Sequence, residues 1–244
     1  MFKVKKSLIY LTIISLLWQA LVYFFNIPTY ILPSPIDIFV SFSNNHMLIL
    51  RNLGITILEI LTGFLLANLA SLMLVCIAFY NKRIENIIFP VSIIIKTIPI
   101  IAIAPIIILW FGTGFVSKVV IVILMCFFPS LINMVGATRM IDRNLFYIFE
   151  IYSASKKQII TKLIIPATLP YLFSSLKISS SLAVIGAIVA EFMAVNKGLG
   201  FLIMSSYYSL NMPMVFASTL LICLIGLLFY YLIDTIEKCL VNWQ

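Results

Sequence analysis

Long apolar runs separated by short polar segments dominate the pattern of this chain. A helix needs about 20 mostly apolar residues to cross a bilayer. Six runs approach that length: 7–25, 53–79, 87–110, 117–137, 170–192 and 214–233. Segments of about ten residues with alternating polar and apolar positions, which are typical of a membrane β-barrel, do not repeat along the sequence. Because backbone groups in lipid must be hydrogen-bonded within their own segment, we predict six transmembrane α-helices.

The composition agrees with a lipid environment. Of the 244 residues, 63% are hydrophobic and only 10% are charged, whereas a soluble globular domain has about 25% charged residues. So few charges could not cover the outside of a soluble protein of this length. No repeat with a period of 20–50 residues and no low-complexity segment divides the chain. We therefore expect an all-α, polytopic membrane protein with one transmembrane domain over residues 1–244 and a core at residues 50–235.

The first run follows a basic head, as it would in a secretory signal sequence. Its apolar part is about 19 residues long, which exceeds a typical signal-sequence core, and no A-x-A-like cleavage site follows it. We interpret residues 7–25 as an uncleaved first span.

The positive charges predict the orientation of the chain. If the N-terminus is cytoplasmic, eleven of the 16 lysines and arginines fall on cytoplasmic segments, and only Arg51 and Lys197 fall on outer connections. This distribution follows the positive-inside rule, and it explains the net charge of +8 without a nucleic-acid partner. Both termini and residues 138–169 are then cytoplasmic.

The connections 26–52 and 193–213 face outward in this orientation. In the first of them we expect Pro33 and Pro35 to prevent regular helix, because proline lacks an N–H and restricts the residue before it.

The cytoplasmic loop 138–169 is long for a membrane protein of this size. Asp142 is suited to be the N-cap of a helix that runs to about Tyr152, and a second short helix is expected to start at Ser155. We expect two prolines, Pro166 and Pro170, to stop that second helix before the fifth span.

The first of these two helices, "NLFYIFEIY" at 144–152, is more apolar than a solvated loop requires. An exposed apolar patch of this kind marks a partner site or a helix that lies on lipid headgroups. The pattern alone does not choose between the two.

The chain resembles the nitrate/sulfonate/taurine-type permeases of ABC importers. The loop matches the pattern E-A-A, three residues, G, nine residues, I-x-L-P, if Ser153 takes the place of the glycine and Leu163–Pro166 that of I-x-L-P. Further matches occur in the same order as in that family: "LPSP" at 32–35, "IPIIAIAPIIILWFGTG" at 98–114, "SK" at 117–118, "FFP" at 127–129, "LPYLFSSLKIS" at 169–179, "AE" at 190–191 and "GLGFLI" at 198–203.

The resemblance implies a type I ABC importer permease with a methionine-importer-like fold, located in the bacterial cytoplasmic (inner) membrane. It implies an importer of two permeases, expected here as a homodimer, with two separate ATPases that bind ATP and Mg²⁺ and an extracytoplasmic solute-binding protein. Each ATPase would hold the 138–169 loop. The residues implied to carry this coupling are Tyr147, Ile148, Phe149, Glu150, Ser153, Ala154, Ser155, Leu163 and Pro166.

The sequence departs from the family pattern within this loop. Tyr147, Ile148 and Phe149 stand where E-A-A is expected, and the nearest carboxylate is Glu150. These bulky side chains imply an ATPase groove of a different shape, so that either the partner has adapted or the coupling is weaker.

Catalytic motifs are absent from the sequence. "GTGFVSK" at 112–118 only superficially resembles a phosphate-binding loop, since its lysine follows serine and it joins two spans. The single histidine, His46, lies in an outer connection and predicts no metal site. The acids within the spans are Glu59 and Glu191, and no spacing relates them. We therefore expect no enzyme activity and no bound cofactor on this chain, so that ATP is hydrolysed by another chain.

The fifth run carries small and hydroxyl residues at every fourth position. Small residues at this spacing let another helix approach closely. They indicate either packing against a helix of the same subunit or a permease–permease interface along which solute passes. The candidate residues are Ser175, Ser179, Ser180, Ala183, Ala187 and Glu191.

Charges within the spans need partners or water, because each costs at least about 2.5–3.5 kcal/mol at the centre of a span. We expect Lys177 to reach the cytoplasmic surface along its own stem and Glu59 to pair with Lys96 or Lys118. Glu191, near the outer end of its span, is expected to be partly wet and either to gate the pathway or to orient the "GLG" loop.

Prolines at 90, 99 and 105 are expected to kink the third run, either as hinges or to fit the bundle.

The sequence thus favours a permease subunit that forms the translocation pathway for a small polar or anionic solute. The alternative is a secondary transporter driven by an ion gradient, which would call for inverted repeats and acids near the membrane midplane.

Overall fold

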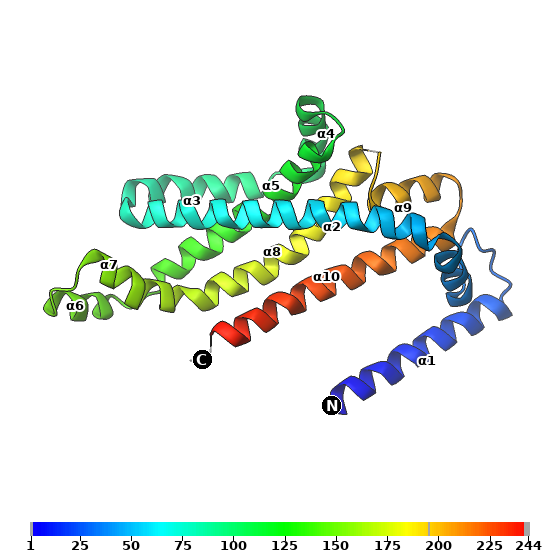
Figure 1. Ribbon diagram of the computed structural model, residues 1–244, viewed down its shortest axis with the longest axis horizontal. Coiled ribbons are helices and arrows are strands. Elements are labelled where there is room, and N and C mark those ends of the chain that lie inside the picture. Colours follow the sequence, from blue (N-terminus) through cyan, green and yellow to red (C-terminus); the bar gives the residue numbers. More distant parts are fainter. Residues whose placement is uncertain (1, 195, 242–244) are drawn as a thin grey trace.

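The computed structural model describes residues 2–194 and 196–241, and in this part of the chain every regular element is helical (Figure 1). The elements are α1 (Phe2–Phe24), α2 (Pro35–Tyr80), α3 (Lys82–Lys96), α4 (Ile100–Phe111), α5 (Phe115–Arg139), α6 (Arg143–Ile151), α7 (Lys156–Ile159), the π-helical turn η1 (Ile160–Ile164), α8 (Ile165–Ala194), α9 (Leu199–Tyr208) and α10 (Met212–Leu240). The all-α prediction is confirmed.

Four helical stretches in the described residues are long and apolar enough to span a membrane alone: Pro35–Ala78, Phe115–Arg139, Lys157–Ala194 and Met212–Leu240. They contain four of the six predicted spans. The first predicted span falls in α1, whose apolar part Ile9–Phe24 is shorter. The third, 87–110, is not a single helix.

The third predicted span is broken into α3 and α4, which meet at an angle of 98°. Pro99 lies at the break as the N-cap of α4. It has no N–H to continue α3, and it forces Ile98 away from helical geometry. Pro90 and Pro105 lie inside α3 and α4. The expected kink is therefore a complete break at Pro99, where the chain turns by 98° from α3 into α4.

The helix α2 begins far earlier than the second apolar run. Ser34 and Asp37 form a capping box in which the Ser34 side chain accepts from the Asp37 N–H and Asp37 accepts from the Ser34 N–H. Pro35 occupies the first helical position, where its missing N–H is no loss. The expectation that Pro35 prevents helix here is wrong, because at this position proline starts one. The only break inside α2 is non-helical geometry at Asn45.

The expectation that Pro166 and Pro170 stop the helix is also wrong. From Lys157 to Ala194 the chain runs as one candidate span through η1 and into α8. Pro166 lies in the first turn of α8, beside the π-helical turn, where the regular hydrogen-bond ladder is already shifted. Thr168 Oγ1 donates to the Ile164 carbonyl at 2.7 Å, which adds a side-chain hydrogen bond in the turn that contains Pro166.

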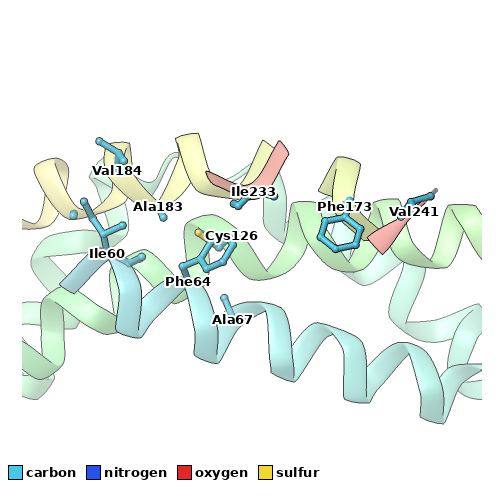
Figure 2. Packing of buried hydrophobic residues seen from close by; sticks show 11 residues of the cluster. Ile60, Phe64, Ala67, Cys126, Phe173, Ala183, Val184, Ile233 and Val241 are labelled. Atoms are coloured by element: carbon cyan, nitrogen blue, oxygen red, sulfur yellow. The ribbon is translucent and has the colours of Figure 1, made fainter. Parts of the chain in front are cut away.

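The main core lies between α2, α5, α8 and α10. Figure 2 shows Phe64 of α2, Cys126 of α5 and Ala183 of α8 within one cluster, together with Ile233 of α10. The contact between α5 and α8 is the most extensive of any described helix pair. These two helices therefore form the centre of the bundle, and α2 and α10 pack against them.

A close helix crossing fixes how α2 meets α5. A Cβ added at Gly63 of α2 would lie 2.5 Å from the Cβ of Val122 on α5. Side chains essentially never approach so closely, so the glycine sets the distance between the two helices.

We predict that Gly63→Ala destabilises the protein by about 1–3 kcal/mol, because the added methyl group overpacks this crossing. Gly54→Ala is the matched control on the same helix, since a Cβ there meets nothing within 4 Å. The control should be neutral or gain up to about 1 kcal/mol from helix propensity. The measurement is the thermal unfolding midpoint of each variant in one detergent, and equal midpoints would contradict the tight crossing.

Candidate functional site

Two features lie at opposite ends of the bundle. The short helices α6 and α7 lie at the end drawn on the left of Figure 1, and the α8–α9 loop with α9 lies toward the other end. An open groove on α8 lies between them along the bundle.

The α6–α7 segment, residues 143–159, is built from local capping interactions. Asp142 Oδ1 accepts from the Asn144 N–H at 2.9 Å at the start of α6. At the start of α7, Ser155 Oγ accepts from the Gln158 N–H at 3.3 Å, and Gln158 Oε1 accepts from the Ser155 N–H at 2.8 Å. Both predicted helix starts are confirmed.

Ser153 makes the turn between these helices. Its φ of +50° is in the left-handed region, which glycine adopts most easily. The Ala154 N–H donates to the Phe149 carbonyl at 2.9 Å, as in the Schellman motif that ends many helices. Glycine is the residue expected in this geometry, and Ser153 stands where the E-A-A loop pattern has its glycine.

The solvent-exposed face of α6 is apolar. Tyr147 and Ile148 are 59% and 48% exposed, and Ile151 and Tyr152 are 80% and 81% exposed. Phe149 is half-buried. The side chain of Glu150 lies outside the described part of the structure.

The remaining coupling candidates differ in exposure. Ser155 is exposed, and Ala154 and Pro166 are half-buried. Leu163 is buried where the segment joins the bundle. The structure therefore leaves α6 and the turn at Ser153 open to a partner and anchors the segment through η1.

The groove on α8 consists of three cavities that share lining residues, with volumes of about 480, 560 and 360 Å³. Ile178 lines all three, and Ser174 and Ser181 line two and one of them. With Ile185, these residues form one exposed row along α8. Lys96, at the end of α3, lines the part of the groove near the α3–α4 bend, and no described side chain forms an ion pair with it.

The predicted row of small residues lies on a different face of α8. Its members are buried inside this chain: Ser175, Ser179, Ser180, Ala183, Ala187 and Glu191. Asn68 Nδ2 donates to Ser179 Oγ at 3.0 Å, and Ser130 Oγ donates to Asn68 Oδ1 at 2.7 Å. Of the two interpretations of this row, packing against helices of the same chain is therefore the one that these contacts support.

Lys177 does not depend on reaching the membrane surface. Its Nζ lies 2.5 Å from Glu237 Oε2 and 3.3 Å from Asp234 Oδ1, both on α10. Asp234 also pairs with Lys238 at 2.5 Å. This cluster contains two cations and two anions.

A second charged cluster, which we call the outer cluster, consists of Glu59 of α2, Lys118 of α5 and Glu191 of α8. Lys118 Nζ lies 2.9 Å from Glu59 Oε1. The structure thus pairs Glu59 with Lys118 and not with Lys96. All three side chains are almost fully buried, so the expectation that Glu191 is partly wet is wrong.

The outer cluster holds the α8–α9 loop. Glu191 accepts from Thr56 Oγ1 at 2.6 Å and from the Gly200 N–H at 2.5 Å. Lys118 donates to the Lys197 carbonyl at 2.7 Å. Glu191 was expected either to gate the pathway or to orient the "GLG" loop. Its hydrogen bond to the Gly200 N–H corresponds to the second role.

The two loop glycines leave room for Glu191. Gly198 has a φ of +108°, and a Cβ there would collide with the Glu191 carboxylate. A Cβ at Gly200 would lie 2.8 Å from the Glu191 Cβ. No other residue type fits either position without a shift of the loop.

Sequence reasoning missed two members of this arrangement. Asn52 Oδ1 accepts from the Gly198 N–H at 2.8 Å, and Thr56 Oγ1 accepts from the Leu199 N–H at 2.9 Å. Asn52, Thr56 and Glu59 are spaced by four and three residues, which places them on one helix face. That polar row within an apolar run was the signal that could have found them.

In the described part of the chain, no three His, Cys, Asp or Glu residues group together as the ligands of a metal ion would. His46 is exposed, and its Nδ1 lies 2.7 Å from the Ser43 carbonyl.

Comparison with known proteins places the chain. The family model described as "Binding-protein-dependent transport system inner membrane component" matches residues 59–241. The chain is 34% identical over 216 residues to the formylaminopyrimidine transport permease protein ThiX of Halalkalibacterium halodurans, covering 88% of this chain and 86% of ThiX. It is 35% identical over 236 residues to the riboflavin transport system permease protein RibX of Chloroflexus aurantiacus, covering 96% and 88%.

A third relative is SsuC of Bacillus subtilis, named as a permease for aliphatic sulfonates. The identity is 31% over 241 residues, covering 98% of this chain and 87% of SsuC. The resemblance to permeases of the sulfonate type is confirmed. The chain therefore belongs to the family of binding-protein-dependent transport system inner membrane components, the membrane-spanning permeases of ABC importers.

Proposed function

We propose that two copies of this chain form the translocation pathway of an ABC importer, and that two separate ATPase chains drive it through the α6–α7 segment. ATP and Mg²⁺ bind to those ATPases, and a solute-binding protein delivers the solute on the outer side. The observation that carries the proposal is the α6–α7 segment itself, an exposed apolar helix with a sharp left-handed turn at one end of the bundle.

The exposed apolar face of α6 suits a protein partner. Tyr147, Ile148, Ile151 and Tyr152 would bury their aromatic and aliphatic surface in a groove on the ATPase. The left-handed turn at Ser153 lets α7 start in a new direction, toward η1 and α8. A push on α6 would therefore act on the continuous helix that crosses the membrane.

The orientation of the chain follows from its charges. The loop that contains α6 and α7 has five of the eleven basic residues assigned to the inner side. We infer that this end of the bundle and both termini are cytoplasmic and that α9 and the α8–α9 loop are extracytoplasmic.

The groove on α8 supplies the lining of the pathway in this proposal. Its exposed row presents the hydroxyl groups of Ser174 and Ser181, and Lys96 adds a positive charge. In a single chain this row is open to the outside, so a second copy facing it would complete an enclosed channel. Hydroxyl groups and one ammonium group per copy suit a small polar or anionic solute.

The choice of solute lies with the binding protein. The names of the relatives refer to formylaminopyrimidine, riboflavin and aliphatic sulfonates. This range is consistent with a shared permease design that serves different polar solutes.

We predict that Ser153→Gly retains transport and that Ser153→Val weakens coupling. Valine in the left-handed region costs about 1–2 kcal/mol, so the turn after α6 should rearrange, whereas glycine adopts it freely. The measurement is ATP hydrolysis by the reconstituted importer with and without its binding protein. Ser43→Val, at an exposed position of α2, is the control and should leave the stimulation unchanged. Full stimulation of the Ser153→Val variant would contradict the role of the turn.

We predict that a cysteine at Tyr152 crosslinks to the ATPase and that a cysteine at Tyr208 does not. The two tyrosines are similarly exposed, 81% and 76%, but lie on α6–α7 and on α9, toward opposite ends of the bundle. In intact cells, a thiol reagent that cannot cross the membrane should label only the cysteine at Tyr208. Labelling of the cysteine at Tyr152 from outside would reverse the proposed orientation.

We predict that Ser181→Cys reacts with a small water-soluble thiol reagent and that Ser180→Cys does not. Ser181 is exposed in the groove, whereas its neighbour Ser180 is fully buried and donates to the Lys177 carbonyl. The exposed natural cysteines, Cys76, Cys223 and Cys239, are first replaced by alanine. Modification of the cysteine at Ser181 should abolish transport. Unimpaired transport after complete modification would show that this face is not the pathway.

A further inference from the structure

We propose that the outer cluster binds one proton, which Glu59 holds and donates toward Glu191, and that this proton keeps the α8–α9 loop in place. The proposal goes beyond the transport function and concerns a site that acts on the loop at the outer end of the bundle.

The charge count of the outer cluster is the first step. Relative exposure is 1% for Glu59, 1% for Lys118 and 0% for Glu191. If all three side chains were ionised, two carboxylates and one ammonium group would leave one negative charge in excess. A buried excess charge of this kind is so unfavourable that the group takes up a proton instead.

Near the cluster, the described residues contain no other charge that could balance it. Among the described residues, α4 and α9 have no charged side chain, and the acids and the lysine of α10 lie at its far, C-terminal end. Arg51 of α2 and Lys197 of the loop have exposed side chains, and Lys197 contributes only its carbonyl.

The hydrogen bonds show which carboxyl group is the better anion. Glu191 accepts from the hydroxyl group of Thr56 and from the backbone N–H of Gly200 at the N-terminus of α9. Donors at a helix N-terminus stabilise negative charge. Glu191 is therefore the carboxylate of the cluster.

Glu59 lacks such donors. Both of its side-chain oxygens are buried without a hydrogen-bond partner in the described structure. Lys118 Nζ lies 2.9 Å from Oε1 as an ion pair, but the contact is not directed as a hydrogen bond, and a separate N–H of Lys118 donates to the Lys197 carbonyl. Of the two carboxyl groups, the one whose oxygens accept no directed hydrogen bond holds the proton, and its O–H can then donate to the neighbouring carboxylate.

The charged cluster at the other end of the bundle is different. There Lys177 and Lys238 balance Asp234 and Glu237, and all four side chains take part in ion pairs. That cluster needs no proton, so it serves as an internal control.

Loss of the proton would act on the loop. Glu191 accepts from the Gly200 N–H, and Lys118 donates to the Lys197 carbonyl. If Glu59 became a second buried anion, both hydrogen bonds would rearrange. We therefore expect a mildly alkaline outer medium to loosen the α8–α9 loop and α9.

The test is infrared spectroscopy of the full chain in lipid nanodiscs, with glutamate labelled by carbon-13. At neutral pH we expect the stretching band of a protonated carboxyl group, which shifts with the label. The band should be lost in Glu59→Gln and kept in the control Glu237→Gln. A labelled wild-type chain without the band would overturn the proposal, and this measurement depends on no variant. Loss of the band only in Glu191→Gln would overturn the assignment to Glu59.

Thermal unfolding gives a second measure. The unfolding midpoint of the wild type should fall as the pH is raised from neutral to mildly alkaline. The buried Glu59 binds its proton more tightly in the folded than in the unfolded protein, so removal of the proton destabilises the folded state. In Glu59→Gln, which imitates the protonated group, this fall should be absent. A midpoint that depends on sodium chloride but not on choline chloride would indicate a bound cation in place of the proton and would overturn the proposal.

Discussion

The absence of water from the membrane interior is the constraint on which this structure depends. Each buried polar group must find its partner within the protein, since lipid offers none. Where α2, α5 and α8 meet, the side chain of Asn68 forms hydrogen bonds with those of Ser130 and Ser179. Thr168 supplies a hydrogen bond near Pro166, where the helix ladder is interrupted. The apolar surface needs no such pairing, which is why so many large apolar side chains are exposed around the bundle.

The same constraint explains how far the fold could be predicted from the sequence. The apolar runs 117–137 and 214–233 correspond closely to α5 and α10, because hydropathy measures the transfer of a segment into lipid. Hydropathy carries no information on direction, so the run 87–110 concealed the right-angled break between α3 and α4. Proline was the other source of error. Its effect depends on position, and Pro35 starts a helix while Pro166 is accommodated beside a π-helical turn.

The candidate sites show a similar division between local and tertiary information. The starts of α6 and α7 could be predicted because caps depend on residues two or three positions apart. The ion pair of Glu59 was expected from the unfavourable burial of a charge, but only the packing of α2 on α5 selects Lys118 over Lys96. The small residues of α8 were recognised as a packing surface, whereas which helix covers them follows from the whole bundle.

The continuous helical stretch from Lys157 to Ala194 has a mechanical consequence. At about 1.5 Å per residue, its 38 residues extend for about 57 Å, more than the full thickness of a bilayer. One end adjoins the turn at Ser153, and the other carries Glu191 against the loop glycines. A helix of this length acts as a lever: a rotation imposed at one end is carried along the backbone to the other, and η1 with Pro166 and Pro170 is the region where the helix bends most easily.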